Sequence, residues 1–572
     1  MTHSSHSPKA PKRRIHPFSA WPVGLPGRMF ALYASWAVGL SALIASLGDW
    51  IQAWWLASVG IGLGILGIMD TRQTSQSIRR NYPILGNLRF FLEFIRPEIR
   101  QYFFESNNDS EPFSRNQRSL VYQRAKSVID KRAFGTQTDL YKPGAEWLNH
   151  ATVAKTVTNT DFRVLVGGPS CKQPYMASIF NISAMSFGAL SGNAILALNQ
   201  GAKMGRFAHD TGEGSVSIYH QKHEGDLIWE IGSGYFGCRD PDGSFSPQKF
   251  RDQAQAAQIK MIEIKLSQGA KPGHGGVLPG SKVSAEIAQA RGVPEGQDCI
   301  SPPAHSAFSN PIELMQFVAQ LRELSGGKPV GFKLCIGHAW EWFSMAKAMV
   351  QTGIKPDFIV IDGSEGGTGA APVEFADHVG SPLLEGLLLA HNTLNGLGIR
   401  DEIRLIASGK IISAFDIAKT CAMGADMCNS ARGFMFALGC VMAQTCHTGA
   451  CPTGVATQDK HRQKALVPEN KAERVFNFHA NTLKALGELL GATGLDHPSQ
   501  IKPFHINRRM ADQRVALLSE IYPFCSPGDL LTGQRPGPLF ERYWDSAQAD
   551  RFSPDNSGWL GVLKAGAASQ AL

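Results

Sequence analysis

The stretch between about residues 180 and 435 alternates short apolar segments with segments of helical pattern. This alternation is typical of parallel β/α units, in which a helix follows each strand. Eight segments qualify as strands, which predicts an α/β fold with a closed (β/α)8 TIM barrel. The eight segments are 181–186, 207–211, 261–266, 298–301, 329–334, 357–361, 403–407 and 426–430.

Two glycine-containing loops follow the seventh and eighth predicted strands. Their sequences are Ser408-Gly409-Lys410 and Ala431-Arg432-Gly433. The active site of a TIM barrel is built from the loops after the strands, and a phosphate group commonly binds on these last two. Glycine allows close backbone approach, and a cation offsets phosphate charge. The loops therefore predict a phosphate-bearing cofactor; the alternative is that Lys410 and Arg432 are merely solvated.

Three cysteines stand close together between Gly439 and Asp459, where Cys440, Cys446 and Cys451 form a Cys-x5-Cys-x4-Cys run. Thiolates hold iron–sulfur clusters, and three ligands rather than four suit a three-iron cluster. The run therefore predicts a [3Fe-4S] cluster; the alternative is three buried structural cysteines. The other cysteines are scattered, which favours a reducing cytosol over a disulfide framework.

Two segments near the N-terminus, 29–47 and 51–69, are apolar and contain no charged residue. Each is close to the ~20 residues that span a bilayer, so the pair predicts a transmembrane hairpin. Basic residues at 12–14 and 79–80 flank the pair, whereas the connecting turn carries only Asp49. This bias places both ends, and the catalytic domain, on the cytoplasmic side of the inner membrane. The alternative is a buried hairpin of a soluble protein. Glycines of the second segment would let the two helices pack closely; they are Gly60, Gly62, Gly64 and Gly67.

The formal net charge of +8 is spread over 572 residues. Its densest concentrations flank the apolar hairpin and form no basic stripe, so we expect no nucleic-acid partner. The predicted domains are a basic cytoplasmic N-terminus (1–28), the transmembrane hairpin (29–69), a mostly helical connecting region (70–160), the barrel with the cysteine run (161–510) and a C-terminal extension (511–572).

A series of motifs lies at the ends of the predicted strands: ISAMSFGALS (182–191), DTGEG (210–214), KLSQGAKPGHGGVLPGSKV (265–283), SPPAH (301–305), FKL (332–334) and GSEGGTGAAP (363–372). With the cysteine run and its CPTGVATQ tail, these motifs resemble the FMN-dependent large subunit of glutamate synthase, in the same order, over about residues 160–510. The resemblance implies a barrel that binds FMN beside an iron–sulfur cluster. It also implies reductive conversion of 2-oxoglutarate and ammonia to glutamate through 2-iminoglutarate.

The resemblance further implies roles for individual residues. Reduced FMN would deliver hydride to the imine carbon, while Glu213 shuttles the required proton. Lys271 is the predicted catalytic and substrate-binding cation, with Arg291 and His274 beside the substrate carboxylates. Lys333 is the predicted cation at the flavin ring; its alternative is a strand-end lysine that reaches solvent. The predicted FMN-binding residues are Ala184, Met185, Ser186, Lys333, Gly366, Gly367, Ser408, Gly409, Lys410, Ala431 and Arg432.

Two positions depart from the family pattern. The family has glutamine where this chain has Val277 before LPG, and an acidic residue where it has His274. Loss of a polar partner can cost orders of magnitude in substrate discrimination. One alternative function is therefore the same flavin chemistry on another 2-oxo acid or an N-substituted amino acid. Another is an electron-transfer or scaffold subunit without substrate turnover of its own.

Two features of full-length glutamate synthases are not recognisable in the sequence. We find no glutaminase domain, so nitrogen would come from free ammonia or from a separate amidotransferase subunit. Nor is there a Gly-x-Gly-x-x-Gly dinucleotide fingerprint after a predicted strand. We therefore expect electrons to reach the flavin from a separate donor, through the iron–sulfur cluster.

Overall fold

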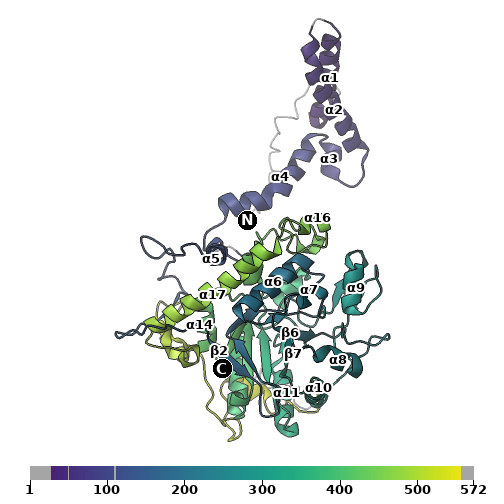
Figure 1. Ribbon diagram of the computed structural model, residues 1–572. Helices are drawn as coiled ribbons and strands as arrows, with labels where there is room; N and C mark the ends of the chain where they lie inside the picture. Colours follow the sequence, from purple (N-terminus) through teal and green to yellow (C-terminus); the bar gives the residue numbers. More distant parts are fainter. Residues whose placement is uncertain (1–26, 49, 109–110, 555–572) are drawn as a thin grey trace, which may run out of the picture. The chain divides into compact units, whose positions relative to one another are not determined.

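The computed structural model describes residues 27–48, 50–108 and 111–554. The chain divides into two compact units, Met1–Ser106 and Asn107–Leu572 (Figure 1). The predicted basic N-terminus up to residue 26, Asp49 of the predicted turn and the end of the predicted C-terminal extension lie outside the described residues.

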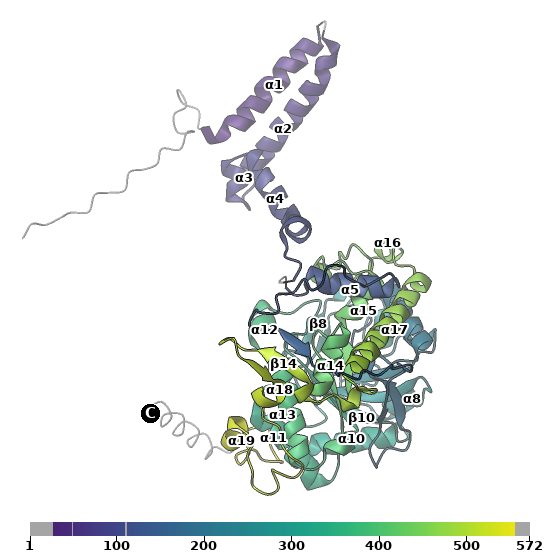
Figure 2. The same cartoon turned by 90° about the vertical axis from the view of Figure 1, so that its left-hand side faces the viewer.

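The first unit is helical, and its two longest helices run antiparallel (Figure 2). With the 3-10 turns that lead into them, they form the segments Gly27–Ser46 and Ile51–Arg72, each of which contains an 18-residue stretch with a mean hydropathy of 1.6. By length and composition both are candidate membrane spans. The elements of this unit are η2 (Gly27–Met29), α1 (Phe30–Ser46), η3 (Ile51–Ala53), α2 (Trp54–Arg72), α3 (Ser77–Asn81), α4 (Leu85–Ile99) and the π-helical turn η4 (Arg100–Phe104).

Glycines bring the backbones of α1 and α2 into contact. A Cβ atom on Gly60 would lie 2.6 Å from the Cα atom of Gly39, and one on Gly64 would lie 2.6 Å from the ring of Trp36. The predicted close approach is thus confirmed at Gly60 and Gly64. It is wrong for Gly62, whose Cβ position has open space, because a residue two positions from Gly60 points to the opposite side of the helix.

The second unit contains a closed barrel of parallel strands, as the alternation of segments predicts. The strand order is β4-β5-β6-β7-β10-β11-β12-β13. Their bounds are β4 Phe180–Ile182, β5 His209–Asp210, β6 Leu227–Ile231, β7 Ile259–Lys265, β10 Val330–Leu334, β11 Phe358–Asp362, β12 Arg404–Ser408 and β13 Met427–Ser430. The predicted α/β TIM-barrel fold is therefore confirmed.

One predicted strand is wrong and one was missed. The predicted strand 298–301 contains β9 (Cys299–Ser301), which pairs antiparallel with β8 (Gly276–Leu278) outside the barrel. The third barrel strand is β6, whose apolar pattern is interrupted by Glu230. That charge faces the barrel interior, as does Glu263 on the neighbouring strand β7, which was predicted. Both differences lie before the fifth barrel strand. The fifth to eighth predicted strands are therefore the fifth to eighth strands of the barrel.

Side chains inside the barrel form two layers, because alternate residues of a strand point to the same side. The lower layer is apolar and packs against the antiparallel hairpin of β2 (Arg163–Val166) and β3 (Tyr175–Ser178). Its barrel members are Ala208, Ile228, Met261, Phe358, Val360, Ile406 and Met427. Two residues further along the same strands, the layer at the carboxyl ends is polar: Asp210, Glu230, Glu263, Asp362, Ser408 and Asn429.

Helices surround the barrel, and the long helix α17 packs beside α6 (Figure 1). Many helices begin at capping residues: Ser191 accepts a hydrogen bond from Ala194 N at α6, and Asn310 accepts one from Glu313 N at α10. The larger helices are α5 (Arg115–Ala125), α6 (Gly192–Gly205), α8 (Pro247–Ala254), α9 (Ala285–Arg291), α10 (Pro311–Leu324), α11 (Ala339–Thr352), α13 (Leu383–Gly396), α14 (Ala414–Ala422), α15 (Arg432–Leu438) and α17 (Pro468–Ala492). The shorter ones are α7 (Ile218–Gln221), α12 (Val373–His378), α16 (Lys460–Gln463), α18 (Leu518–Ile521) and α19 (Pro538–Tyr543).

A small sheet joins a segment that precedes the barrel in the sequence to segments that follow it. Strand β1 (Glu146–Leu148) pairs antiparallel with β14 (Ile506–Arg509), which in turn pairs with β15 (Val515–Leu517). Glu146 also forms an ion pair with Arg508 at 2.6 Å. Segments on either side of the barrel in sequence are thus held together.

Candidate active site

Two adjoining cavities open at the carboxyl ends of the barrel strands. The first lies on the loops after β12 and β13, and the second, of about 300 Å³, lies beside the loops after β4 and β5. They share six lining residues: Ala184, Gln268, Gly367, Thr368, Ala431 and Arg432. Every residue predicted to bind FMN lines at least one of these cavities.

The loops after β12 and β13 need glycine for their backbone conformation and for close packing within the protein. Gly409 has a φ of +155°, and a Cβ on Gly433 would lie 2.6 Å from Ser430 Oγ. The side chain of Lys410 turns outward: its Nζ forms an ion pair with Glu111 Oε2 at 2.9 Å. Any contribution of Lys410 to phosphate binding in this conformation would therefore come from its backbone.

Asn429 is a lining residue that the sequence analysis missed. It is 1% exposed, and among the described residues neither its Nδ2 nor its Oδ1 atom has a hydrogen-bond partner. A buried unpaired amide is costly unless a ligand satisfies it. The glycine-lined loops and this amide fit a cofactor with a phosphate group and a polar ring. The only signal in the sequence was its position, two residues after Met427 on the eighth strand.

Lys333 is the penultimate residue of β10, the fifth barrel strand, and lines the first cavity. It is 3% exposed and forms ion pairs with Glu230 and, at 3.1 Å, with Glu263 Oε1. Burial acts to lower the pKa of Lys333, but the surrounding carboxylates outweigh it and raise the pKa well above its usual value. The alternative of a lysine that reaches solvent is thus wrong.

Glu213 lies at the rim of the second cavity among three cations. Its Oε2 atom is 3.2 Å from Lys265 Nζ. Burial acts to raise the pKa of Glu213, but Lys265, Arg291 and Lys271 outweigh it, and the pKa lies below its usual value. Glu213 is therefore a carboxylate at neutral pH, surrounded by more positive charge than it can neutralise.

The three cations are held in different ways. Lys271 Nζ donates to the Gly275 carbonyl at 3.1 Å, and burial lowers the pKa of Lys271. Arg291 is buried behind the rim, where Nη2 donates to the Phe187 carbonyl at 3.1 Å and the guanidinium lies over the Phe236 ring. Lys265 had no predicted role, although it opens the KLSQGAKPG motif at the end of β7. Its proximity to Glu213 follows from the barrel and is not visible in the sequence.

The two positions that depart from the family pattern also lie at this rim. Val277 is 59% exposed on β8 and lines the second cavity. The exposed ring of His274 contacts its neighbour's carbonyl, with Nδ1 2.7 Å from Gly275 O, and lines a smaller cavity together with Glu213, Lys265 and Lys271. The structure thus places the substituted positions beside the residues predicted to bind substrate.

The three cysteines of the run lie on a loop after α15. Cys446 lines the second cavity, whereas neither Cys440 nor Cys451 lines it. Burial raises the pKa of Cys440. At Cys451 burial also acts to raise the pKa, but backbone N–H groups of the following residues lower it below its usual value. Such N–H groups suit a thiolate ligand. All ten cysteines are free.

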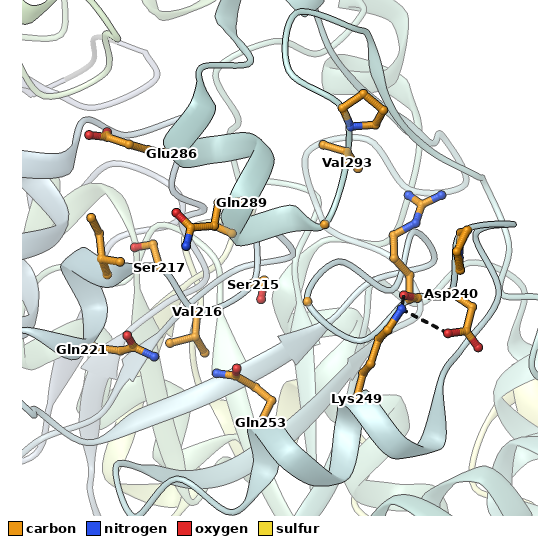
Figure 3. A pocket seen from close by; sticks show the side chains of 17 residues that line it. Ser215, Val216, Ser217, Gln221, Asp240, Lys249, Gln253, Glu286, Gln289 and Val293 are labelled. Carbon is orange, nitrogen blue, oxygen red and sulfur yellow. Dashed lines mark hydrogen bonds and ion pairs between the residues drawn. The ribbon is translucent and has the colours of Figure 1, made fainter.

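A further cavity of about 690 Å³ lies between α7, α8 and α9 (Figure 3). Polar side chains line it, among them Ser215, Gln253, Glu286 and Gln289, and Lys249 forms an ion pair with Asp240 at 3.1 Å. None of the predicted site residues lines this cavity.

The sequence of the chain resembles those of known proteins. A sequence model of the conserved region in glutamate synthase matches residues 136–496. The chain is 38% identical to the glutamate synthase large subunit-like protein YerD of Bacillus subtilis, over 78% of this chain and 92% of that protein. It is 39% identical to the archaeal glutamate synthase [NADPH] of Methanocaldococcus jannaschii, but over 55% of this chain and only 59% of that protein.

Solved structures resemble the chain more remotely. A mandelate oxidase aligns over 70% of this chain and 99% of its own, with 14% identity and a TM-score of 0.40. A similarity of this size carries no argument about activity. The family match covers more than half of the chain and contains the barrel and the cysteine run. The chain therefore belongs to the glutamate synthase family.

Proposed function

We propose that the chain is a membrane-anchored oxidoreductase that uses FMN and an iron–sulfur cluster to convert 2-oxoglutarate and ammonia reductively to glutamate. The observation that carries this proposal is the rim around Glu213. Three cations, Lys265, Lys271 and Arg291, act on one carboxylate beside the cavity predicted to hold FMN. This excess of positive charge suits a substrate with two carboxylates.

FMN would be held by the glycine-containing loops at its phosphate end and by Ala184, Met185, Ser186, Lys333 and Asn429 near its ring. When bound, it supplies the two electrons that reduce the imine. The ammonium of Lys333, held by its ion pairs, would provide positive charge to a bound ring without any rearrangement.

The remaining chemistry is positioning and proton transfer by the chain itself. Lys271 and Arg291 would orient the carboxylates of the oxo acid, and the ionised Glu213 would attract ammonium to the same rim. As the C–N bond forms, a Glu213 oxygen accepts a proton from the nitrogen, and it can return that proton when water leaves. A side chain that is ionised at neutral pH but surrounded by cations can perform both steps.

A second candidate is favoured by Val277 and His274. Val277 places an exposed apolar side chain where the family has an amide, beside the cavity lined by Glu213 and Lys271. A substrate with an apolar group near this position would suit the rim better than 2-oxoglutarate does. In this second candidate function the flavin chemistry is the same, but the 2-oxo acid or the amine differs.

The test is anaerobic purification of the full chain in detergent, reduction of its flavin, and addition of 2-oxoglutarate with ammonium. Reoxidation that needs both compounds and yields glutamate supports the proposal. If the flavin is reoxidised only when a different oxo acid or a different amine replaces one of these two compounds, the second candidate is supported. A protein without bound flavin contradicts both.

The cluster and the membrane anchor require separate tests. Iron analysis and electron paramagnetic resonance of the oxidised protein should detect a three-iron cluster, which Cys446→Ser should remove. The two apolar helices should hold the chain in the membrane fraction after a high-salt wash, and a chain recovered in the supernatant would contradict anchoring. A cluster that is present would be the route from an electron-donor protein to the flavin.

A further inference from the structure

The polar layer of the barrel contains a cluster of three carboxylates that the proposed reaction does not use. Asp210, Glu230 and Glu263 come from the consecutive strands β5, β6 and β7, and one oxygen of each lies within 4.8 Å of the other two. None is more than 1% exposed. Lys333 enters the same cluster from β10 and forms ion pairs with Glu230 and Glu263.

One cation cannot balance three buried carboxylates. Among the described residues, Asp210 Oδ2 and Glu263 Oε2 have no hydrogen-bond partner. Burial without full charge compensation favours the protonated acid. Since the Lys333 ammonium already occupies the position between two carboxylates, a divalent metal ion would meet a like charge there. A proton is the ligand that this arrangement suits.

The charge states follow from these contacts. Burial raises the pKa of Asp210 to about 7, partly offset by Lys333, and raises that of Glu263 well above its usual range. Burial also raises the pKa of Asp362 on β11, against the effect of Lys333. Asp210 thus exchanges its proton near neutral pH, and its titration is coupled to that of Glu263.

The surroundings of Asp210 contain few other charges. Lys265 on β7 acts on it more weakly than Lys333 does. On the remaining strands of the polar layer, Ser408 of β12 and Asn429 of β13 are uncharged. Lys333, Asp362 and Asn429 line the first cavity, and Glu230 lines the second, so the cluster forms the floor beneath the predicted FMN site.

We propose that Asp210, Glu230, Glu263 and Lys333 form a buried proton-binding site that is coupled to the redox state of FMN. The inference rests on the proposed function, because it requires FMN in the first cavity. When an external donor places two electrons on FMN, the added negative charge acts on the same ammonium that compensates the carboxylates. A carboxylate of the cluster then binds a proton from solvent and becomes a carboxylic acid. Reoxidation of FMN by substrate releases the proton.

The experiment counts protons without substrate turnover. The full chain with bound FMN is reduced at an electrode in weakly buffered detergent solution, so that the donor supplies electrons only, and a pH indicator records uptake. At about pH 8, wild type should take up more protons than Asp210→Asn, by up to about one per FMN. At about pH 5.5 the two counts should coincide, because Asp210 is already protonated.

Glu341→Gln is the matched control. Glu341 lies on α11, and burial raises its pKa as it does that of Asp210, but it lines neither cavity. Its proton count should equal that of wild type at both pH values. Protons bound on reduction of the iron–sulfur cluster are common to all variants and cancel in the comparison.

Equal counts in wild type and Asp210→Asn at both pH values, with FMN bound in each, would overturn the inference and leave the proposed function intact. If Asp210→Asn does not bind FMN, Glu263→Gln takes its place in the same comparison. Failure of both variants to bind FMN would show that the carboxylates hold the site together instead of exchanging protons, which also overturns it. A wild-type protein without FMN would contradict the proposed function itself.

Discussion

The cluster around Glu213 and the cluster around Lys333 are opposites. At the rim, three cations act on one carboxylate, and the pKa of Glu213 falls below its usual value despite burial. In the barrel interior, three carboxylates share one cation, and the pKa values of Asp210 and Glu263 rise. The sign of the shift is therefore set by the balance of charge, and burial alone does not determine it. The rim is suited to hold anions, and the interior is suited to hold a proton.

The largest expected effect comes from removing the only cation of the interior cluster. Lys333→Met leaves buried carboxylates without compensation and should reduce the free energy of unfolding by about 3–5 kcal/mol. Chemical denaturation of the full chain measures this loss. The double variant Lys333→Met/Glu230→Gln removes the paired charge as well and should recover part of it. A single variant as stable as wild type would contradict the role of Lys333 as the compensating charge.

Removing the carboxylate of the rim should affect turnover rather than stability. Glu213→Gln should lower glutamate formation by about 10²-fold or more, because the amide cannot accept a proton, while the flavin content stays at the wild-type level. Glu286→Gln is a suitable control, since Glu286 lines the separate cavity of Figure 3. Unchanged turnover in Glu213→Gln would refute its assigned role.

The cations of the rim should set the acidic limit of activity. Glu213 acts in its ionised form, so activity is lost as the pH falls through its pKa. Lys265 lowers that pKa, and Lys265→Gln should therefore move the acidic limb of the kcat/KM profile to higher pH. Lys260→Gln, at the other end of the same strand, should leave the profile in place. A shift to lower pH would reverse the electrostatic argument.

The smallest expected effect concerns the exposed side of the rim. Val277→Gln restores the amide of the family pattern and should lower the KM for 2-oxoglutarate by about 5-fold with little change in kcat, equivalent to about one hydrogen bond. Ile300→Gln is the control, because Ile300 pairs directly with Val277 across β8 and β9 and has nearly the same exposure, 61% against 59%. If both variants change KM alike, the change comes from adding a polar side chain at an exposed position and not from a contact with the substrate.

The sequence predicted the barrel because seven of its strands are short, mostly apolar segments that alternate with segments of helical pattern. It missed β6, which contains Glu230 of the interior cluster, but the charge itself is not the reason, because β7 was predicted although it contains Glu263. Only closure of the barrel shows that three such charges face one lysine.

Site residues that belong to a contiguous sequence motif could be predicted. Site residues that are recognised only by their contacts in the folded protein could not. Glu213, Lys271 and the glycine-containing loops belong to contiguous motifs, and the structure places them around adjoining cavities. Lys265 and Asn429 acquire their positions from strand register, which brings together residues far apart in the chain. His274 and Val277 differ from the family motif, and the structure places both beside Glu213.

The pairing of β1 with β14 has a consequence for the order in which the protein is made. Leu148 pairs with Ile506, so the sheet cannot form until the ribosome has synthesised the whole barrel. At ordinary elongation rates this takes roughly 20–70 s after β1 has been translated. The helices α1 and α2 are complete well before that interval begins. The nascent chain therefore carries two finished apolar helices while its barrel still has open strand edges, and it is in this interval that a chaperone would be needed most.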